Sequence, residues 1–362
     1  MSTIELQNLT KSFGDLTAVN DVSLKVDQNE VLCLLGPSGC GKTTTLRMVA
    51  GLEIATSGNI LIDNINVNEL ETRDRNLAMA FQFYALYPSL TVGENLANPL
   101  YAENMSEKEI KDKIFEIADI LQLREIINRK PHQLAEGEKQ RVAVGRAIIR
   151  DPKCFLFDEP LSRLDVQLRE QMRGQIKEVL SDLNKATVIV THDQLEALTM
   201  ATKIAVMRDG LIEQISSPHD IFAKPENTFV AGFIGTPQMN IADCNIDTIN
   251  SSELEISLLN QKIKIDFGSS LNVNTNENYF LGIRPRSFDL AEKESTDSLS
   301  GEVDLIENMG SEVLLHIKSN EASFRAVQSR SHKIKLGDVI HLKPKKSQVH
   351  LFNKDGKVVG HG

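Results

Sequence analysis

Short apolar runs recur along the first two thirds of the chain and alternate with polar or helix-like segments. Nearly alternating apolar residues in segments 4–9 and 22–26 predict two edge strands that precede the core. The uninterrupted apolar run 31–35 predicts a buried strand, because a strand covered on both faces has no polar side. This opening therefore predicts an α/β core, in which strands and helices alternate along the chain.

Further strand-length apolar runs follow at residues 60–67, 77–81, 154–157 and 187–190. Residues 107–123 instead place apolar side chains at helical spacing, so this middle portion predicts a helical insertion. In segment 206–215, Asp209-Gly210 is a strong hairpin signal between two apolar runs. We expect the mostly parallel core sheet to end near this hairpin.

The sequence pattern changes from about residue 236. Short strand-length pieces containing Ile or Val alternate there with Asn and Ser, without a long helical pattern. Short strands separated by turn residues are typical of a small β-barrel or sandwich. With the boundary at Gly235-Thr236-Pro237, we expect an α/β domain over residues 1–235 and an all-β domain over residues 236–362.

Composition restricts the partners and the compartment. The 362 residues carry a formal net charge of −10, which argues against broad nucleic-acid binding, since that needs clustered Lys and Arg. The four cysteines lack a C-x-x-C spacing and predict reduced thiols in a cytosolic protein. No apolar run approaches the roughly 18 to 20 residues that cross a bilayer, and the polar start lacks a signal-peptide core. Any membrane role is expected to be peripheral.

The strongest chemical signal comes directly after the run 31–35. It fits the pattern G-x-x-x-x-G-K-[ST] and consists of Gly36, Pro37, Ser38, Gly39, Cys40, Gly41, Lys42, Thr43 and Thr44. In this pattern, backbone N–H groups of the glycine-rich turn point at phosphate oxygens. Lys42 reaches the β and γ phosphates, Thr43 holds Mg²⁺, and the helix that begins here adds its positive dipole end. The chain is therefore expected to bind a nucleoside triphosphate.

Two carboxylates follow the apolar strand 154–157. Asp158 is placed to hold Mg²⁺, and Glu159 to polarise the water that attacks the γ-phosphate. His192 follows the strand 187–190 and is a candidate donor to the γ-phosphate, because phosphates bind at the carboxyl ends of strands in α/β proteins. This set predicts hydrolysis of the triphosphate as well as binding.

At these residues the chain resembles the ATPase subunits of ABC transporters, and more closely the sugar and polyol importer branch typified by the maltose importer's ATPase. The resemblance spans nearly the whole chain. It implies a P-loop ABC ATPase domain with an antiparallel β subdomain and a helical insertion, followed by a small OB-like domain of the TOBE type. ATP and Mg²⁺ are the implied ligands. The implied location is the cytoplasmic face of the inner membrane, with two membrane-spanning permease subunits and an extracytoplasmic solute-binding protein.

The resemblance also assigns further residues. Phe13 occupies the position that stacks on adenine, and Gln82 that of the loop glutamine that senses Mg²⁺ and the attacking water. The aromatic residues after Gln82, including Tyr84, resemble the face that receives a helix of the membrane subunit. Segment 162–165 resembles the loop that crosses the dimer interface, although Arg163 stands where the family usually has Asn.

One motif departs from the family pattern. Where the family carries Leu-Ser-Gly-Gly-Gln before a helix, this chain has Leu134, Ala135, Glu136, Gly137 and Glu138. In the family, this signature contacts the γ-phosphate held by the opposite subunit. Ala135 lacks the hydroxyl for that contact, and carboxylates now stand at a helix N-terminus that would otherwise attract phosphate. An alternative is that the altered loop still closes through Gly137 and the helix dipole.

This departure favours a partner that is a related ATPase subunit with an intact signature, the other possibility being a homodimer. The leading hypothesis is the energy-coupling ATPase of an importer for a small polar solute, such as a sugar or a polyol like glycerol. A regulatory subunit that binds ATP with little hydrolysis is one alternative, and a soluble ABC ATPase not coupled to transport is another. In the C-terminal domain, segments 282–285 and 307–310 resemble turns of the importer family, and Arg284 is otherwise expected to be a solvated charge.

Overall fold

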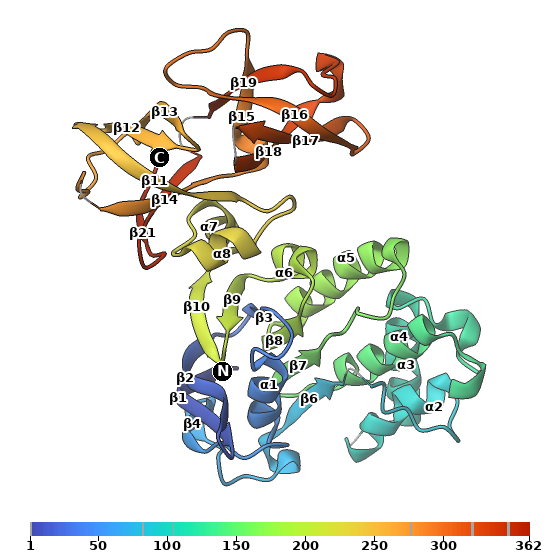
Figure 1. Ribbon diagram of the computed structural model, residues 1–362. Helices are drawn as coiled ribbons and strands as arrows, with labels where there is room; N and C mark the ends of the chain where they lie inside the picture. Colours follow the sequence, from blue (N-terminus) through green and yellow to red (C-terminus); the bar gives the residue numbers. More distant parts are fainter. Residues whose placement is uncertain (1, 82, 104, 276, 320–321, 346–347) are drawn as a thin grey trace. The chain divides into compact units, whose positions relative to one another are not determined.

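The computed structural model describes all residues except 1, 82, 104, 276, 320–321 and 346–347, and it divides the chain into two compact units. These units are Met1–Pro218 and His219–Gly362 (Figure 1). The division falls before the boundary expected at Gly235, because two short helices belong with the C-terminal unit. Each unit is described by itself below.

An antiparallel sheet opens the first unit. Its strand order is β2-β1-β4-β5, with β1 at Ile4–Phe13, β2 at Leu16–Val26, β4 at Ser57–Ile62 and β5 at Ile65–Asn66. The first two strands therefore form a separate sheet and are not edges of the core sheet, which corrects that expectation. The run 60–67 contains two strands because Asp63 and Asn64 adopt positive φ values of 52° and 63° and turn the chain.

The second sheet of this unit has the order β10-β9-β3-β8-β7-β6. Its strands are β3 Val31–Leu35, β6 Leu77–Ala80, β7 Cys154–Asp158, β8 Ala186–Thr191, β9 Lys203–Arg208 and β10 Leu211–Ser216. The pairs β3·β8, β3·β9, β7·β8 and β6·β7 are parallel, whereas β10 is antiparallel to β9. The hairpin at Asp209-Gly210 is confirmed, with φ values of 50° and 80° at the two turn residues.

In the described part of the first unit, six α-helices lie between the strands in chain order. Their bounds are α1 Lys42–Ala50, α2 Val92–Ala97, α3 Glu107–Ile120, α4 Glu136–Ile148, α5 Val166–Leu183 and α6 Gln194–Met200. The helix expected over residues 107–123 is confirmed but ends at Ile120. It begins with a capping box, in which Ser106 Oγ accepts from the Glu109 N–H and the Glu109 carboxylate accepts from the Ser106 N–H. Among the described residues, none of the helices combines the length and apolar composition that crossing a bilayer requires.

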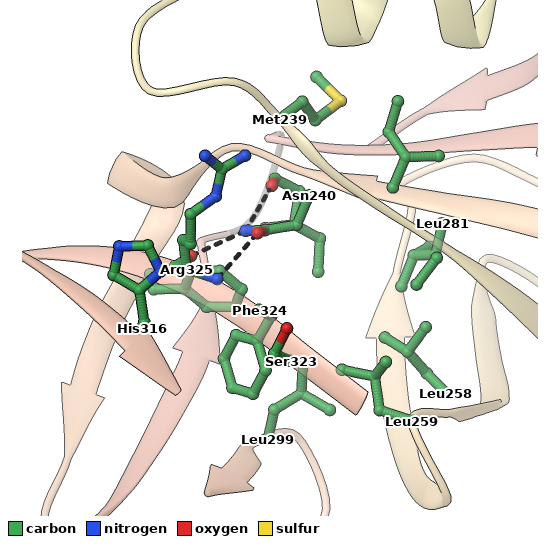
Figure 2. A pocket seen from close by; sticks show the side chains of 14 residues that line it. Met239, Asn240, Leu258, Leu259, Leu281, Leu299, His316, Ser323, Phe324 and Arg325 are labelled. Atoms are coloured by element: carbon green, nitrogen blue, oxygen red, sulfur yellow. Dashed lines mark hydrogen bonds between the residues drawn. The ribbon is translucent and has the colours of Figure 1, made fainter. Parts of the chain in front are cut away.

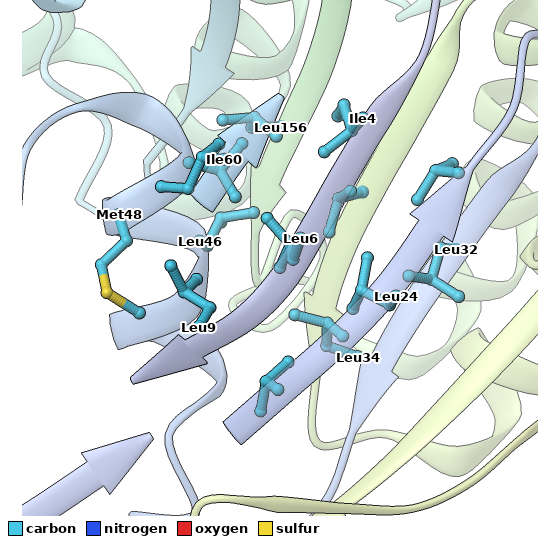
Figure 3. Packing of buried hydrophobic residues seen from close by; sticks show 14 of the residues in the cluster. Ile4, Leu6, Leu9, Leu24, Leu32, Leu34, Leu46, Met48, Ile60 and Leu156 are labelled. Atoms are coloured by element: carbon cyan, nitrogen blue, oxygen red, sulfur yellow. The ribbon is translucent and has the colours of Figure 1, made fainter. Parts of the chain in front are cut away.

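Apolar residues of both sheets and of α1 form one buried cluster. Leu6 of β1, Leu46 of α1 and Leu34 of β3 are each less than 3% exposed within it. Figure 3 shows side chains of the antiparallel sheet facing those of α1 and of the core strands. Burying a side chain of this size contributes about 1.5–3 kcal/mol relative to exposure. The N-terminus of α1, and the loop before it, are therefore held between two packed layers.

The C-terminal unit contains α8 Thr228–Phe233 and two antiparallel sheets, and α7 Pro218–Ala223 leads into it. The first sheet has the order β13-β12-β11-β14-β20-β21, with bounds Gln261–Asp266, Glu253–Leu258, Asn240–Asn250, Asn278–Ile283, Val349–Asn353 and Val358–His361. The second has the order β15-β19-β16-β17-β18, with bounds Phe288–Ala291, Val339–Pro344, Leu299–Asn308, Glu312–Ser319 and Ala322–Ser329. One apolar cluster joins both sheets, as expected for a sandwich or barrel.

Asn240 ties the two sheets together at one edge of a cavity of about 440 Å³. Its amide donates to the carbonyls of Ile283 and Arg325, and its side-chain oxygen accepts from the Arg325 N–H at 2.8 Å. Figure 2 shows Phe324 and Leu281 lining the same cavity from the two sheets. The expected turn at residues 307–310 is confirmed by the register of β16 and β17 and by the φ of 87° at Gly310.

Arg284 attaches the short helices to this unit. It is only 7% exposed, so the expectation of a solvated charge is wrong. Its guanidinium donates to the carbonyls of Ile234 and Phe222 at 2.7 and 2.6 Å and lies 3.7 Å from the centroid of the Phe222 ring. Burial lowers the pKa of Arg284 to about 10. These contacts give the physical reason for a boundary earlier in the chain than residue 235.

Candidate functional site

The glycine-rich loop between β3 and α1 is held closely by its neighbours. A Cβ on Gly36 would lie 2.2 Å from the Met207 carbonyl oxygen, and a Cβ on Gly41 would lie 2.4 Å from that of Ala18. Gly41 also has a φ of 102°, a conformation that L side chains rarely adopt. The chain can follow this path only with glycine at these positions.

Lys42 is the first residue of α1, and its side chain turns back over the same loop. Its side chain is buried, and its ammonium group donates to the carbonyls of Gly36 and Pro37, both at 2.8 Å. The first turn of α1 contains no acidic residue. A fixed cation beside the positive end of a helix provides the electrostatic environment that a phosphate group needs.

The carboxyl ends of the core strands meet beside this loop. In the sheet register, Leu35 is paired with Thr191 on β8, and Asp158 is paired with Val190. Thr43 Oγ1 donates to Asp158 Oδ1 at 3.2 Å, although the two residues come from different elements. Burial raises the pKa of Asp158, and the hydrogen bond from Thr43 opposes that shift.

Thr43 and Asp158 fit the expected Mg²⁺ site. A hydroxyl and a carboxylate oxygen are hard ligands, and Mg²⁺ usually takes one or two such groups together with phosphate oxygens and water. The third residue expected in this set, Gln82, lies outside the described residues. The two described oxygens, at hydrogen-bonding distance beside the phosphate loop, are therefore the observation that supports a metal here.

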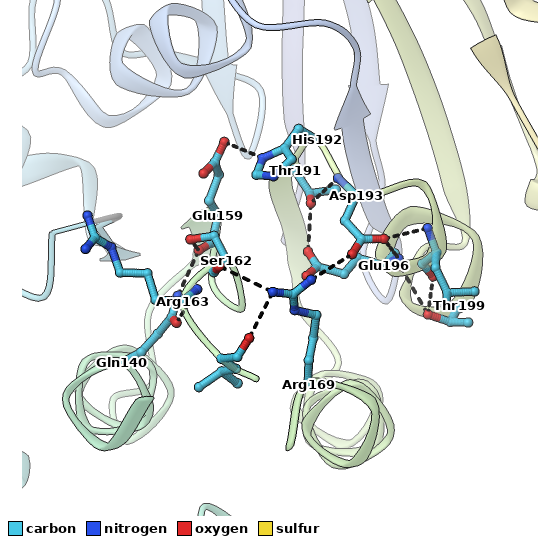
Figure 4. Close-up of polar contacts among 12 residues, drawn as sticks. Gln140, Glu159, Ser162, Arg163, Arg169, Thr191, His192, Asp193, Glu196 and Thr199 are labelled. Carbon is cyan, nitrogen blue, oxygen red and sulfur yellow. Dashed lines mark hydrogen bonds and ion pairs between the residues drawn. The ribbon is translucent and has the colours of Figure 1, made fainter. Parts of the chain in front are cut away.

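Glu159 and His192 also come together. His192 Nδ1 lies 2.9 Å from Glu159 Oε1. Figure 4 shows the two side chains pointing toward each other. Glu159 has a φ of 51°, and its N–H donates to the Val190 carbonyl at 2.9 Å. Its own carbonyl accepts from Gln140 Nε2 at 3.0 Å and from Ser162 Oγ at 3.1 Å. The backbone of Glu159 is fixed on both sides, which orients its carboxylate toward the imidazole.

A second group of polar residues supports the His192 loop. Thr191 Oγ1 donates to the Glu196 carboxylate at 2.7 Å, and Arg169 pairs with Asp193 at 3.4 Å. Asp193 also caps α6 by accepting from two backbone N–H groups. The sequence analysis missed Arg169 and Glu196. An Asp directly before a helical pattern is a cap signal that identifies Asp193, but nothing in the sequence points to its partner on α5.

The altered signature lies at the N-terminus of α4, and both of its carboxylates have partners. Ala135 is the N-cap residue and offers no side-chain acceptor, while Glu138 accepts from the Ala135 N–H at 2.8 Å. Glu136 accepts from Tyr84 Oη and from Lys139 Nζ, both at 2.7 Å.

The other residues of the altered signature are packed against the chain. Leu134 is buried. A Cβ on Gly137 would come within 3.0 Å of a side-chain atom of Leu164. Gln140, one turn further along α4, connects this region to Glu159.

Most of the aromatic residues assigned from the resemblance are exposed. Phe13, at the end of β1, is 47% exposed, and Lys11 Nζ lies 4.7 Å from its ring centroid. Phe83 is 71% exposed and Tyr87 is 44% exposed. Tyr84 is only partly exposed, and its hydroxyl donates to Glu136. The stacking role of Phe13 and the docking role of the aromatic residues after Gln82 stay predictions.

The core sheet edge thus brings together a lysine beside a glycine-rich loop, two oxygen groups suited to bind a metal, and a carboxylate paired with an imidazole. This arrangement defines the class of the protein as a P-loop nucleoside triphosphatase. Comparisons with known proteins narrow the class. A family model described as "ABC transporter" matches residues 19–162, and one described as "TOBE domain" matches residues 281–352.

Several relatives match along nearly the full length, among them the following two. The trehalose/maltose import ATP-binding protein MalK of Thermococcus litoralis is 40% identical over 374 residues, which cover 99% of this chain and 100% of the relative. The sn-glycerol-3-phosphate import ATP-binding protein UgpC of Psychromonas ingrahamii is 41% identical over 369 residues, which cover 98% and 95%. A solved dimeric post-hydrolysis structure of the ATP-binding cassette MJ0796 bound to ADP and Pi matches with a TM-score of 0.55 and 31% identity, covering 59% of this chain and 98% of that one.

The chain belongs to the family of ABC transporter ATP-binding subunits. It is similar over its whole length to the import subunits of that family, and it is accordingly an ATPase. The expected fold class, a P-loop ABC ATPase followed by a TOBE domain, is confirmed.

Proposed function

We propose that this chain is the energy-coupling ATPase of an importer for a small polar solute, in particular a sugar or a polyol such as glycerol. The observation that carries the proposal is a hydrolytic set of residues at one sheet edge, within a chain that matches import subunits from end to end. The relatives' names, which refer to trehalose, maltose and sn-glycerol-3-phosphate, support the solute class.

In this proposal each residue at the sheet edge has a distinct role toward ATP. Backbone N–H groups of the loop 36–44 and Lys42 hold the β and γ phosphates, and Phe13 stacks on the adenine. Thr43 and Asp158 hold Mg²⁺, which offsets the charge of the phosphates. Glu159 accepts a proton from the attacking water, and His192 both orients Glu159 and donates to the γ-phosphate.

We further propose that the tip of α4, residues 134–138, completes an ATP site on a second chain. The similarity to a dimeric ATP-binding cassette bound to ADP and Pi supports this arrangement. The loss of one hydrogen bond to a charged phosphate costs about 1.5–3 kcal/mol, so Ala135 alone weakens that site roughly tenfold or more. A related ATPase with an intact signature is therefore the partner that best completes this chain's own site.

The remaining partners are those of an importer. We place the chain at the cytoplasmic face of the inner membrane, bound to two membrane-spanning permease subunits that work with an extracytoplasmic solute-binding protein. The exposed rings of Phe83 and Tyr87 are the surface offered to a helix of the membrane subunit. Membrane components are expected to be recovered with the chain, and their consistent absence would contradict the importer function.

The test repairs the tip of α4. The triple variant Ala135→Ser/Glu136→Gly/Glu138→Gln restores the family signature in the same chain. Its MgATP turnover should exceed that of the unmodified chain by about tenfold or more, because both sites of a homodimer regain the phosphate contact. Mixing the unmodified chain with a related ATPase subunit should have a similar effect. Rapid turnover by the unmodified chain that the repair leaves unchanged would contradict the pairing.

The altered tip also favours a second candidate function, a regulatory subunit that holds ATP with little hydrolysis. The repaired variant separates the two possibilities. A purely regulatory chain binds MgATP but stays inactive after repair, whereas an ATPase limited by its tip recovers turnover.

A further inference from the structure

Arg163 connects three segments around the altered tip. It lies in the loop before α5, where its N–H donates to Gln140 Oε1 at 3.0 Å (Figure 4). Its guanidinium carbon lies 5.7 Å from the ring centroid of Phe83 and 5.9 Å from that of Tyr84. Its Nη1 is 4.0 Å from Glu136 Oε2. The loop before α5, the segment 83–84 and the tip of α4 therefore meet at this one side chain.

The tip of α4 carries two carboxylates, and both have partners within the chain. The Glu138 carboxylate accepts a hydrogen bond from the Ala135 N–H. Glu136 pairs with Lys139 on the same helix, at 2.7 Å, and faces Arg163 from outside the helix. Hydrogen bonds from Lys139 and Tyr84, together with the charge of Arg163, lower the pKa of Glu136. Burial and the bond to Glu136 raise the pKa of Tyr84 to about 12, so its hydroxyl stays a donor.

We propose that Arg163 is a positioning residue that offsets the charge of Glu136 and holds it against Tyr84, so that the tip of α4 can approach a triphosphate. The proposal rests on the proposed function, in which this tip meets ATP bound to a second chain. An unopposed carboxylate there would face the phosphates directly, and like charges at an interface slow and weaken association. The two departures from the family pattern, at positions 136 and 163, are then parts of one arrangement.

The effect is expected on closure of the ATP site and not on folding. The pair is partly exposed, with the two side chains 43% and 55% accessible, and exposed ion pairs contribute little to stability. Water is excluded when two chains close over a nucleotide, so the same pair matters more in that state. Turnover and thermal unfolding should therefore respond differently to its removal.

The test is a double-mutant cycle on the full-length chain with MgATP. Arg163→Asn and Glu136→Gly are made singly and together, and each introduces the residue that the family usually has. Arg163→Asn should lower turnover about three- to tenfold when Glu136 is present, and less than about twofold in the Glu136→Gly background. Arg163→Lys, which keeps the charge, should restore most of the lost turnover, and added salt should reduce the defect of Arg163→Asn by screening.

A matched control is Arg124→Asn. Arg124 also pairs with a carboxylate, Asp119 at 3.3 Å, and lies 3.9 Å from the ring centroid of Phe115, but it is on the helical insertion away from the tip of α4. Its loss should leave turnover unchanged. If Arg163→Asn lowered turnover equally with Glu136 and with Gly at position 136, or lowered it in neither background, the proposal would be overturned. Failure of the unmodified chain to bind MgATP, or to hydrolyse it both after the triple repair and after mixing with a related subunit, would instead overturn the proposed function itself.

Discussion

Replacement of Glu159 by Gln removes a base while preserving the shape of the side chain. The amide has nearly the same size as the carboxylate and can keep its contact with His192, which is 2.9 Å away. The backbone bonds that fix residue 159, to Val190, Gln140 and Ser162, do not involve the side chain. The free energy of unfolding should therefore change by no more than about 0.5 kcal/mol.

The chemical step should be affected much more strongly. Proton transfer to a positioned base contributes about 10²–10⁴-fold to a rate, which corresponds to roughly 3–5 kcal/mol of activation free energy. In the proposed site, ATP is bound by the loop 36–44 and by the residues expected to hold Mg²⁺, and the substitution leaves all of these intact. Glu159→Gln should thus bind MgATP with normal affinity and hydrolyse it at least about a hundredfold more slowly.

Two measurements on one sample check this prediction. Phosphate release reports hydrolysis, and the ATP that stays with the protein through gel filtration reports trapping. Glu30→Gln is the matched control, since Glu30 precedes β3 at the opposite end of the strand and pairs with Lys203 at 2.7 Å. Hydrolysis by Glu159→Gln at the rate of the unmodified chain would remove Glu159 from its role.

Two further predictions concern the loop and the C-terminal unit. Gly41→Ala should weaken MgATP binding at least about tenfold, because its Cβ would lie 2.4 Å from the Ala18 carbonyl at a φ of 102°, and such strain costs about 1–3 kcal/mol. In calorimetric titrations, the control Gly174→Ala, whose Cβ would meet no described atom within 4 Å, should bind normally. Arg284→Met should destabilise the C-terminal unit by about 2–4 kcal/mol, since it leaves two buried carbonyls without their donor. Calorimetry should show a Tm lower by roughly 5–15 °C with MgATP affinity unchanged, and an unaltered Tm would contradict the anchoring role.

The parts of the fold that depend on local pattern could be predicted from the sequence. The buried strand 31–35, the hairpin at residues 209–210 and the glycine-rich loop each carry their signal within a few adjacent residues. Segment 60–67 was predicted as one strand, whereas it contains the end of β4, a turn at Asp63 and Asn64, and β5. The sheet to which the first two strands belong depends on distant pairing, which a period of two does not encode.

Contacts between distant segments account for the features of the site that the sequence did not reveal. Gln140 is one polar residue on a helix until the fold brings it to the carbonyl of Glu159. The meeting of Tyr84, Glu136 and Arg163 likewise depends on three segments whose separation along the chain carries no spacing signal. Roles assigned from the family resemblance, including that of Phe13, remain predictions.

The bonds from Arg284 to residues 222 and 234 affect how the protein can be divided experimentally. A recombinant fragment that begins at residue 236 would lose both acceptors and the aromatic ring against which the guanidinium lies. A cut close to residue 219 instead keeps α8 and most of α7 with the sheets beneath them. Chimeras that exchange the TOBE-containing portion between related subunits should therefore be joined ahead of these short helices.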